Sequence, residues 1–266
     1  MKLNKIIKNS LFLKSLRLAK ANPSKIGLMV LFDISFLVSF FYVLPTLAGY
    51  FAQSIVISEA TGTLLVLNIF SLGYILLVLL VYSFFKYGVL DFIKSLFMKT
   101  GFSFNRLGQF YFLNVMIFLP TFILFSGILG SIKEAYRPYA FIFLGIAVFL
   151  FLYVIINVSH SLFYQGSSAK ASIKTGFSIA FSKIKIYREM ILLMILSALV
   201  LALLFFGAGY LIGILASKNY SLYLSAYAYF NKVSIIIFDL AFYLVILINR
   251  ISFYAVIREN KNIKNN

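Results

Sequence analysis

Long runs of apolar residues recur six times along this chain, with short polar or charged segments between them. An α-helix rises about 1.5 Å per residue, so about 20 apolar residues cross the roughly 30 Å hydrocarbon core of a bilayer. Each run is long enough to do so. The pattern predicts an all-α polytopic protein with six transmembrane helices, at Ile26–Phe51, Thr63–Phe85, Phe110–Ile132, Tyr139–Tyr164, Met190–Ala216 and Val233–Ile257.

Two basic segments between the spans carry apolar residues at helical spacing, with lysines off the apolar stripe. This pattern is typical of amphipathic helices that lie in the membrane interface. We expect one such helix in 89–100 and another in 167–186. The apolar positions are Leu90, Ile93 and Phe97 in the first segment and Ile173, Phe177, Phe181 and Ile184 in the second. In the amino-terminal arm, a bend near Asn9 and Ser10 would align two apolar faces.

Similar tetrapeptides open three basic segments, beginning at Ile7, Ile93 and Ile173. Each segment leads into a pair of spans, so the unit would be an interfacial helix plus a hairpin, three times over. The alternative is that basic amphipathic loops are common in such proteins without any repeat. Leu-Pro-Thr also recurs, around Pro45 and Pro120, where each proline removes a backbone donor and should kink its helix.

Composition agrees with a membrane class. Hydrophobic residues make up 62% of the 266 residues and charged residues 12%, whereas soluble domains are about 25% charged. A soluble fold of this size could not bury so much apolar surface in one core. The chain has no Cys and a single His, which excludes disulfides and makes a His-based metal site improbable.

Basic residues are concentrated in alternate connections. Twenty of the 24 Lys and Arg residues lie in the amino-terminal arm, the second and fourth connections and the carboxyl end, and four lie elsewhere. Basic residues close to span ends favour the cytoplasmic side. We expect a cell-membrane protein with both termini in the cytoplasm, built of a basic arm (1–25), a six-span domain (26–257) and a basic tail (258–266). Topology then accounts for the net charge of +17, and no nucleic-acid partner is expected.

The sequence contains no pattern typical of catalysis. Its seven acids are scattered, and it lacks paired-carboxylate motifs and Gly-rich phosphate loops. We therefore expect no enzymatic activity, no cofactor and no metal.

Polar residues inside spans remain functional candidates, because a bare charge in hydrocarbon is costly. Asp33 in the first span and Arg250 in the sixth lie at similar depths, and His160 lies near the same side in the fourth. We expect Asp33 and Arg250 to pair, with His160 nearby. The pair would either stabilise helix packing or take part in proton or substrate movement.

Asp239 is a candidate near the opposite side of the membrane, with Asn68 at comparable depth. It could be a hydrogen-bonded carboxyl between helices or could face a hydrated vestibule. Asn114 and Asn157 are expected to form hydrogen bonds between helices.

Span five contains Gly209 and Gly213, a spacing that allows close helix approach. Tyrosines then recur at helical spacing before span six, at Tyr220, Tyr223 and Tyr227, followed by Tyr229. The tyrosine ring is apolar and its hydroxyl is polar, which favours the membrane interface. We expect an outer interfacial anchor, with a ligand-binding aromatic patch as the alternative.

The chain combines six spans with basic segments that precede a hairpin, such as Ser172-Ile173-Lys174 and Phe181-Ser182-Lys183. In this respect the chain resembles a loose group of uncharacterised prokaryotic six-span membrane proteins. These are similar to the membrane domain that accompanies some glycerophosphodiester phosphodiesterases. The resemblance implies a membrane domain without chemistry of its own, since the phosphodiesterase activity belongs to a separate soluble domain. No catalytic residue is carried over.

Two classes of function fit these features. The first is a non-enzymatic scaffold, accessory subunit or lipid-interacting protein whose basic inner face contacts the bilayer and its anionic headgroups. Its protein partners are not specified by the sequence. The second is a small transporter or channel, which needs a continuous polar path and could use carbonyls exposed near Pro45 and Pro120. The sparse polarity of the spans favours the first class.

Overall fold

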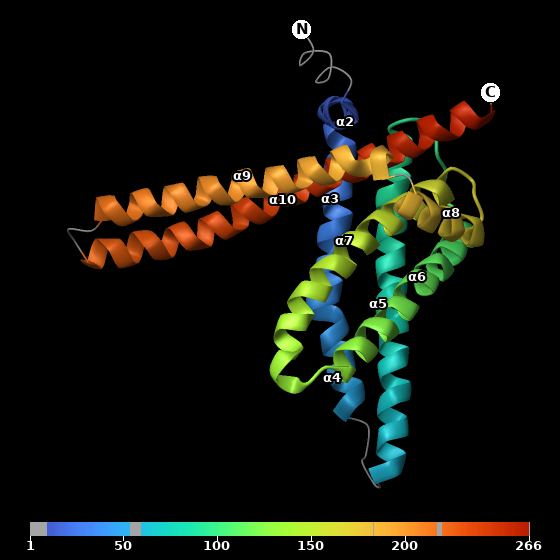
Figure 1. The fold of residues 1–266 in the computed structure, drawn as a ribbon, viewed down its shortest axis with the longest axis horizontal. Helices are drawn as coiled ribbons and strands as arrows, with labels where there is room; N and C mark the ends of the chain where they lie inside the picture. Colours follow the sequence, from blue (N-terminus) through green and yellow to red (C-terminus); the bar gives the residue numbers. More distant parts are fainter. Residues whose placement is uncertain (1–9, 54–59, 183, 217–219, 266) are drawn as a thin grey trace. The chain divides into compact units, whose positions relative to one another are not determined.

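The computed structural model describes residues 10–53, 60–182, 184–216 and 220–265 (Figure 1). Within these ranges the chain is helical between short connections and forms no strand. Six helices in the same ranges are long and apolar enough to cross a membrane, which confirms the predicted all-α polytopic fold. They are Pro23–Tyr50, Asn68–Ser95, Phe104–Ser131, Glu134–Tyr164, Tyr187–Ile214 and Leu224–Glu259.

The chain divides into two compact units, which we call the terminal unit (Met1–Ala19 and Lys183–Asn266) and the central unit (Lys20–Ser182). The terminal unit contains α2 (Leu11–Lys20, except for its last residue), α9 (Ile184–Ala216) and α10 (Tyr220–Asn265). The central unit contains the other elements, namely α3 (Pro23–Val38), a π-helical turn (Ser39–Val43), α4 (Leu44–Gln53), α5 (Ala60–Ser95), α6 (Phe104–Ser131), a 3-10 turn (Glu134–Tyr136), α7 (Arg137–Tyr164) and α8 (Ala169–Ser182).

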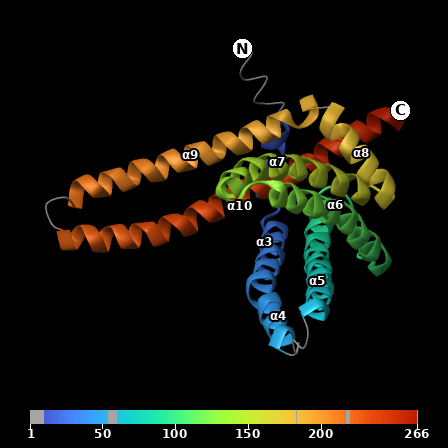
Figure 2. The ribbon, with the colours of Figure 1, turned by 60° about the horizontal axis from the view of Figure 1, so that its bottom comes forward.

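In the central unit α3 lies antiparallel to α5 (Figure 2). The Lys25 amine donates to the carbonyl of Ser95 at 2.7 Å, at the basic ends of the two helices. Further along, the Phe32 ring lies edge-on to Phe92, with 5.5 Å between the centroids. Gly88 lies beneath the same ring, and a Cβ at this position would come within 2.6 Å of Phe32 Cδ1. Glycine therefore permits the close approach of α3 and α5.

The helix irregularity expected at Pro45 is present as the π-helical turn that precedes it. The N–H of Leu44 bonds to the carbonyl of Ser39, five residues earlier. This wider turn suits a following proline, whose ring clashes with the carbonyl four residues before it in a regular α-helix. Pro120, by contrast, lies inside an uninterrupted α6.

The two Leu-Pro-Thr tripeptides share one local hydrogen bond. Thr46 Oγ1 donates to the carbonyl of Tyr42 at 2.6 Å, and Thr121 Oγ1 donates to the carbonyl of Ile117 at 2.7 Å. In both cases the hydroxyl is satisfied within its own helix. This is how hydroxyl side chains are accommodated in hydrocarbon, where unsatisfied polar groups are costly.

The prediction of a separate interfacial helix in 89–100 is wrong for its first part. Residues 89–95 continue α5, which extends unbroken to Ser95. No proline interrupts this stretch, and Asp91 and Lys94 are ordinary residues for a helix that leaves the hydrocarbon. The hydropathy pattern marked where the apolar run ends, near Phe85, and not where the helix ends.

Helix α7 ends in a Schellman motif that turns the chain sharply into α8. The N–H of Gly166 bonds to the carbonyl of Phe163 and the N–H of Ser167 to that of Leu162. The motif needs a residue with positive φ, which Gly166 supplies with φ of 97°. Helix α8 then packs closely against α7.

The face of α8 that is buried carries the small residues Ser172, Gly176 and Ala180. The predicted apolar stripe lies beside this face. Phe177 is 36% exposed and Phe181 72% exposed, although both rings contact Phe151 of α7. The stripe is therefore available to the membrane interface where we expect α8 to lie. The side chain of Ile184, which we placed on the stripe, is outside the described residues.

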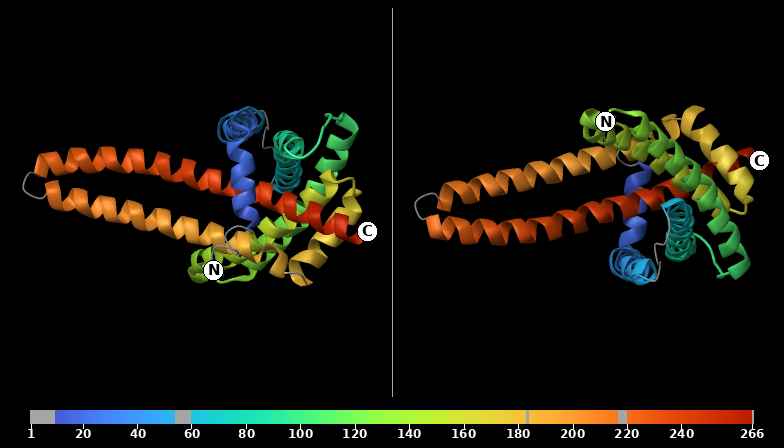
Figure 3. Two further views of the ribbon diagram at one scale, coloured as in Figure 1. Left: turned by 90° about the horizontal axis from the view of Figure 1, so that it is seen from above. Right: turned by 90° about the horizontal axis from the view of Figure 1, so that it is seen from below.

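In the terminal unit α9 and α10 form a long antiparallel pair (Figure 3). Phe205 and Phe238 pack edge-on with 5.9 Å between their centroids, and Tyr187 stacks on Phe253 near the opposite end. Ser10, just before α2, donates a hydrogen bond to the carboxylate of Glu189. The bend expected near Asn9 and Ser10 involves residues outside the described ranges.

The threefold repeat is not uniform in the described helices. Short separate helices, α2 and α8, precede the hairpins α3–α5 and α9–α10. Before the α6–α7 hairpin the corresponding segment is the end of α5. The middle unit thus departs from the predicted helix-plus-hairpin pattern, because α5 has no break that would release its last turns.

Candidate functional site

A chain of buried polar side chains links three helices of the central unit. Asn114 of α6 donates through Nδ2 to Ser83 Oγ of α5 at 2.9 Å. Asn114 Oδ1 lies 2.8 Å from Nε2 of His160 on α7. Ser83 Oγ in turn donates to the carbonyl of Leu79 at 2.6 Å. Ser83, Asn114 and His160 are each 0% exposed.

The order of donors determines the tautomer of the histidine. Since Asn114 donates through Nδ2, its Oδ1 must accept, and the hydrogen bond from His160 requires a proton on Nε2. The series is therefore directional, from His160 through Asn114 and Ser83 to a backbone carbonyl. Such a chain can hold three helices in one register, because each polar group depends on its neighbour for a partner.

Aromatic rings enclose this polar chain. The Phe110 ring centroid lies 4.6 Å from that of His160, and Phe163 lies 5.6 Å from Phe110. The Tyr164 hydroxyl donates to the carbonyl of Tyr87 at 2.5 Å. The polar chain is consequently enclosed by protein atoms, which suits helix packing more than movement of a substrate.

Arg106, near the start of α6, contacts Phe163, one of the aromatic residues around the polar chain. Its guanidinium donates through Nη2 to the carbonyl of Phe163 at 3.0 Å. It also lies 5.2 Å from the centre of the Phe163 ring, a cation–π distance. Arg106 thus satisfies a carbonyl at the end of α7 and holds the start of α6 beside it.

The packing of α7 on α8 leaves two serine hydroxyls enclosed. Within the part of the chain that the structure describes, Ser159 Oγ and Ser172 Oγ have no hydrogen-bond partner, and both residues are 0% exposed. A Cβ on Gly176 would overlap Ser159 Oγ and lie 3.3 Å from Ser159 Cβ. Small residues therefore set the distance between these helices.

The predicted pair of Asp33 and Arg250 stays a prediction. Each side chain is partly buried, Asp33 on α3 of the central unit and Arg250 on α10 of the terminal unit. His160, which we expected near them, hydrogen-bonds Asn114. Asp239 on α10 and Asn68 on α5 are exposed.

The asparagine predictions have different outcomes. Asn114 forms the expected hydrogen bonds between helices, whereas Asn157 donates to the carbonyl of Tyr153 within α7 at 2.7 Å. Sequence reasoning missed Ser83. A polar residue inside an apolar run was the available signal, but a single serine in a span is too common to stand out.

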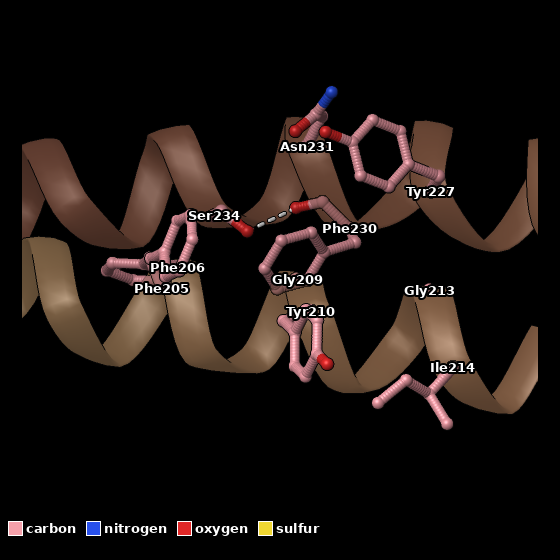
Figure 4. Close-up of a pocket in the computed structure, with 10 residues that line it drawn as sticks. All are labelled: Phe205, Phe206, Gly209, Tyr210, Gly213, Ile214, Tyr227, Phe230, Asn231 and Ser234. Carbon is pink, nitrogen blue, oxygen red and sulfur yellow. Dashed lines mark hydrogen bonds between the residues drawn. The ribbon is translucent and has the colours of Figure 1, made fainter.

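A groove of about 650 Å³ lies between α9 and α10 in the terminal unit (Figure 4). The Phe230 ring packs onto Gly209, where a Cβ would lie 3.2 Å from Phe230 Cε1. This contact confirms close approach at Gly209, but Gly213 opens into the groove, and a Cβ there would meet nothing described within 4 Å. The groove is lined by Phe205, Phe206, Gly209, Tyr210, Gly213, Ile214, Tyr227, Phe230, Asn231 and Ser234.

Tyrosines near the start of α10 fit the predicted interfacial anchor in one respect. Tyr220 is 76% exposed and Tyr229 72% exposed, so their rings are available to a membrane interface. Tyr227 lines the groove, which keeps the aromatic ligand patch open as the alternative. The side chain of Tyr223 is outside the described residues.

The described residues offer no site for a metal. In the described ranges, no group of three His, Asp or Glu side chains comes close enough to hold an ion. Neither the groove of Figure 4 nor a second one between α6 and α8 is lined by Asp33 or Asp239.

Comparison with known proteins gave no relative: no family model, curated protein or solved structure matches the chain. The class that the fold defines is a multi-pass α-helical membrane protein.

Proposed function

We propose that this protein is a non-enzymatic scaffold or accessory component of the cell membrane, whose basic cytoplasmic side holds anionic lipid. The observation that carries the proposal is the closed polar chain of Ser83, Asn114 and His160. Asn114 hydrogen-bonds both of its neighbours, and all three side chains are fully buried inside packed helices, as expected of a rigid support and not of a permeation path.

Two hydrogen bonds of the central unit support the predicted grouping of its basic segments on one side of the membrane. The hydrogen bond from Lys25 to Ser95 joins the start of α3 to the end of α5, and that from Arg106 to Phe163 joins the start of α6 to the end of α7. Cations from segments assigned to the same side thus lie at adjoining helix ends. Surface-proximal Lys and Arg each attract anionic lipid by about 1 kcal/mol.

Cysteine labelling tests the orientation cleanly, since the chain has no native Cys. Ser131→Cys should react with an impermeant thiol reagent in intact cells, while Thr175→Cys and Asn262→Cys should react only after lysis. Ser131 and Thr175 are both exposed, whereas Ser172 is fully buried and would be a poor reporter. Labelling of Asn262→Cys in intact cells would contradict cytoplasmic termini.

Lipid selectivity tests the role itself. We expect the purified full chain to retain phosphatidylglycerol in preference to phosphatidylcholine when native mass spectrometry follows titration with each lipid. The preference should weaken at high salt, because charge attraction is screened. Equal retention of the two lipids would contradict the proposal.

A small transporter or channel is the second candidate, favoured by one observation. Asp239 is exposed within a candidate span, where a carboxylate in contact with lipid is costly. If Asp239 serves transport, vesicles containing the protein should conduct protons or small ions, and Asp239→Asn should abolish the flux. Flux unaffected by this substitution would remove the candidate.

A further inference from the structure

A groove of about 510 Å³ opens between the first turns of α6 and α8 in the central unit. Asn105 and Gln109 line it from α6, Lys170 lines it from α8, and Ser168 lines it from the residue just before α8. All four side chains carry hydrogen-bond donors, and Lys170 adds a positive charge. Among the described residues that line this groove, none is acidic. Its donors and charge match a phosphate group.

Gly108 is among the residues that line the groove. It lies on the wall formed by α6, and a Cβ built there would meet no described atom within 4 Å. A larger side chain at this position could therefore enter the groove without straining the helix. The glycine offers a way to fill the site while leaving its polar groups in place.

The adjoining face of α6 changes from polar to apolar along its length. Asn105 and Gln109 are followed at helical spacing by Phe112 and Met116, which are 55% and 49% exposed. Phe112 also lines the groove. A phospholipid has the same order of chemistry, with a phosphate at one end and acyl chains at the other.

We propose that the groove between α6 and α8 binds the phosphate of an anionic phospholipid in the cytoplasmic leaflet, with an acyl chain along Phe112 and Met116. The assignment rests on the proposed function, since it names where that lipid is held. Lys170 pairs with the phosphate charge, while Asn105, Gln109 and Ser168 donate hydrogen bonds to its oxygens.

The test compares groove variants with matched controls in the purified full chain, using phosphatidylglycerol and native mass spectrometry. Lys170→Gln and Gly108→Leu should each weaken retention about tenfold, because the first removes a charge-assisted hydrogen bond to the phosphate and the second fills the groove. Lys174→Gln is the charge control, because Lys174 is exposed on α8 and does not line the groove. Gly127→Leu is the volume control, since its Cβ also meets nothing described within 4 Å. Gly127→Leu should stay within about twofold of the parent protein, and the loss in Lys174→Gln should not exceed about fivefold, the equivalent of ~1 kcal/mol for one cation near an anionic surface.

Other outcomes overturn the assignment. Unchanged retention in both groove variants excludes the site, and an equal loss in Lys174→Gln shows diffuse charge attraction. Binding of inorganic phosphate that both groove variants lose, with phosphatidylglycerol retention unchanged in the same variants, would identify free phosphate as the ligand and contradict the lipid assignment. If the parent protein does not prefer phosphatidylglycerol, the proposed function itself fails. If the parent protein and the groove variants prefer phosphatidylglycerol equally, the proposed function stands but the groove between α6 and α8 is not the lipid site.

Discussion

The two halves of α7 belong to one candidate span and differ in their surroundings. In the first half Phe141, Phe143 and Phe149 are each more than half exposed, at 57%, 74% and 61%. In the second half Val154, Ile155 and every residue from 157 to 164 are buried. The buried half also carries a group of polar residues, namely Asn157, Ser159, His160 and Ser161.

This difference in burial is expected for a helix whose surroundings are lipid tails and not water. A phenylalanine surrounded by lipid tails gains little by moving into a protein interior, whereas a polar group in hydrocarbon gains a hydrogen-bond partner. Small residues add close van der Waals contact between helices. The contacts among α5, α6, α7 and α8 accordingly include the positions where the chain departs from uniform apolarity, namely Ser83, Asn114, Ser159, His160, Ser172 and Gly176.

The largest effect should come from filling the tight contact of the buried half. Gly176→Ala should lower the free energy of unfolding in detergent by about 2 kcal/mol, because its Cβ overlaps Ser159 Oγ in a close-packed contact. Ser159→Gly should restore most of the loss in the double variant. Gly127→Ala, in open space on α6, should be neutral or slightly stabilising. Equal losses in Gly176→Ala and Gly127→Ala would show that the α7–α8 contact is loose.

Removing the centre of the polar chain should have the next largest effect. Asn114→Ala breaks both the bond to Ser83 and the bond to His160, and should cost about 1–2 kcal/mol. Thermal unfolding in detergent measures the loss, with Asn68→Ala as the control because Asn68 is exposed. A similar loss in the control would mean that the polar chain does not stabilise the buried half.

A smaller loss of stability is expected from a test of the donor that His160 provides to Asn114. His160→Gln retains a donor that can reach Asn114 Oδ1, while His160→Leu leaves that oxygen unsatisfied. The leucine variant should be less stable than the glutamine variant by about 1 kcal/mol in the same unfolding assay. The reverse order would indicate that His160 acts through volume alone.

The smallest effect is expected in the exposed half. Phe143→Leu changes a side chain that is 74% exposed, so the free energy of unfolding should move by less than about 0.5 kcal/mol. Phe163→Leu, at a ring that is 1% exposed and packed against Phe110, is the matched comparison and should cost clearly more. Equal losses of unfolding free energy in the two variants would show that the difference in burial between the two halves of α7 does not affect stability.

The sequence predicted the number of spans well, because hydropathy reports which stretches belong in hydrocarbon. It predicted helix ends poorly for the same reason. Helix α6 begins at Phe104 and not at Phe110, since Asn105, Arg106 and Gln109 lower the hydropathy of a turn that is nonetheless helical. Helix α10 likewise starts well before Val233.

The candidate site was predictable only in part. Asn114 stood out because an amide inside a span needs a partner. Its partners, Ser83 and His160, depend on the register of α5 and α7 against α6, which local sequence patterns do not contain. The small face of α8 was missed because Phe177 and Phe181 dominated the apolar pattern, whereas Gly176 carries no side chain to signal a contact.

The sharp turn at Gly166 has a consequence for biogenesis. The helices α7 and α8 that it joins are neighbours in the chain, and Ser159 meets Gly176 across a separation of few residues. Loop closure for such a contact is inexpensive. Once the ribosome has released Ser182, this hairpin has every residue that its own contact requires, before α9 and α10 have been synthesised. The nascent chain can thus tether α8 to an inserted span at an early stage of membrane insertion.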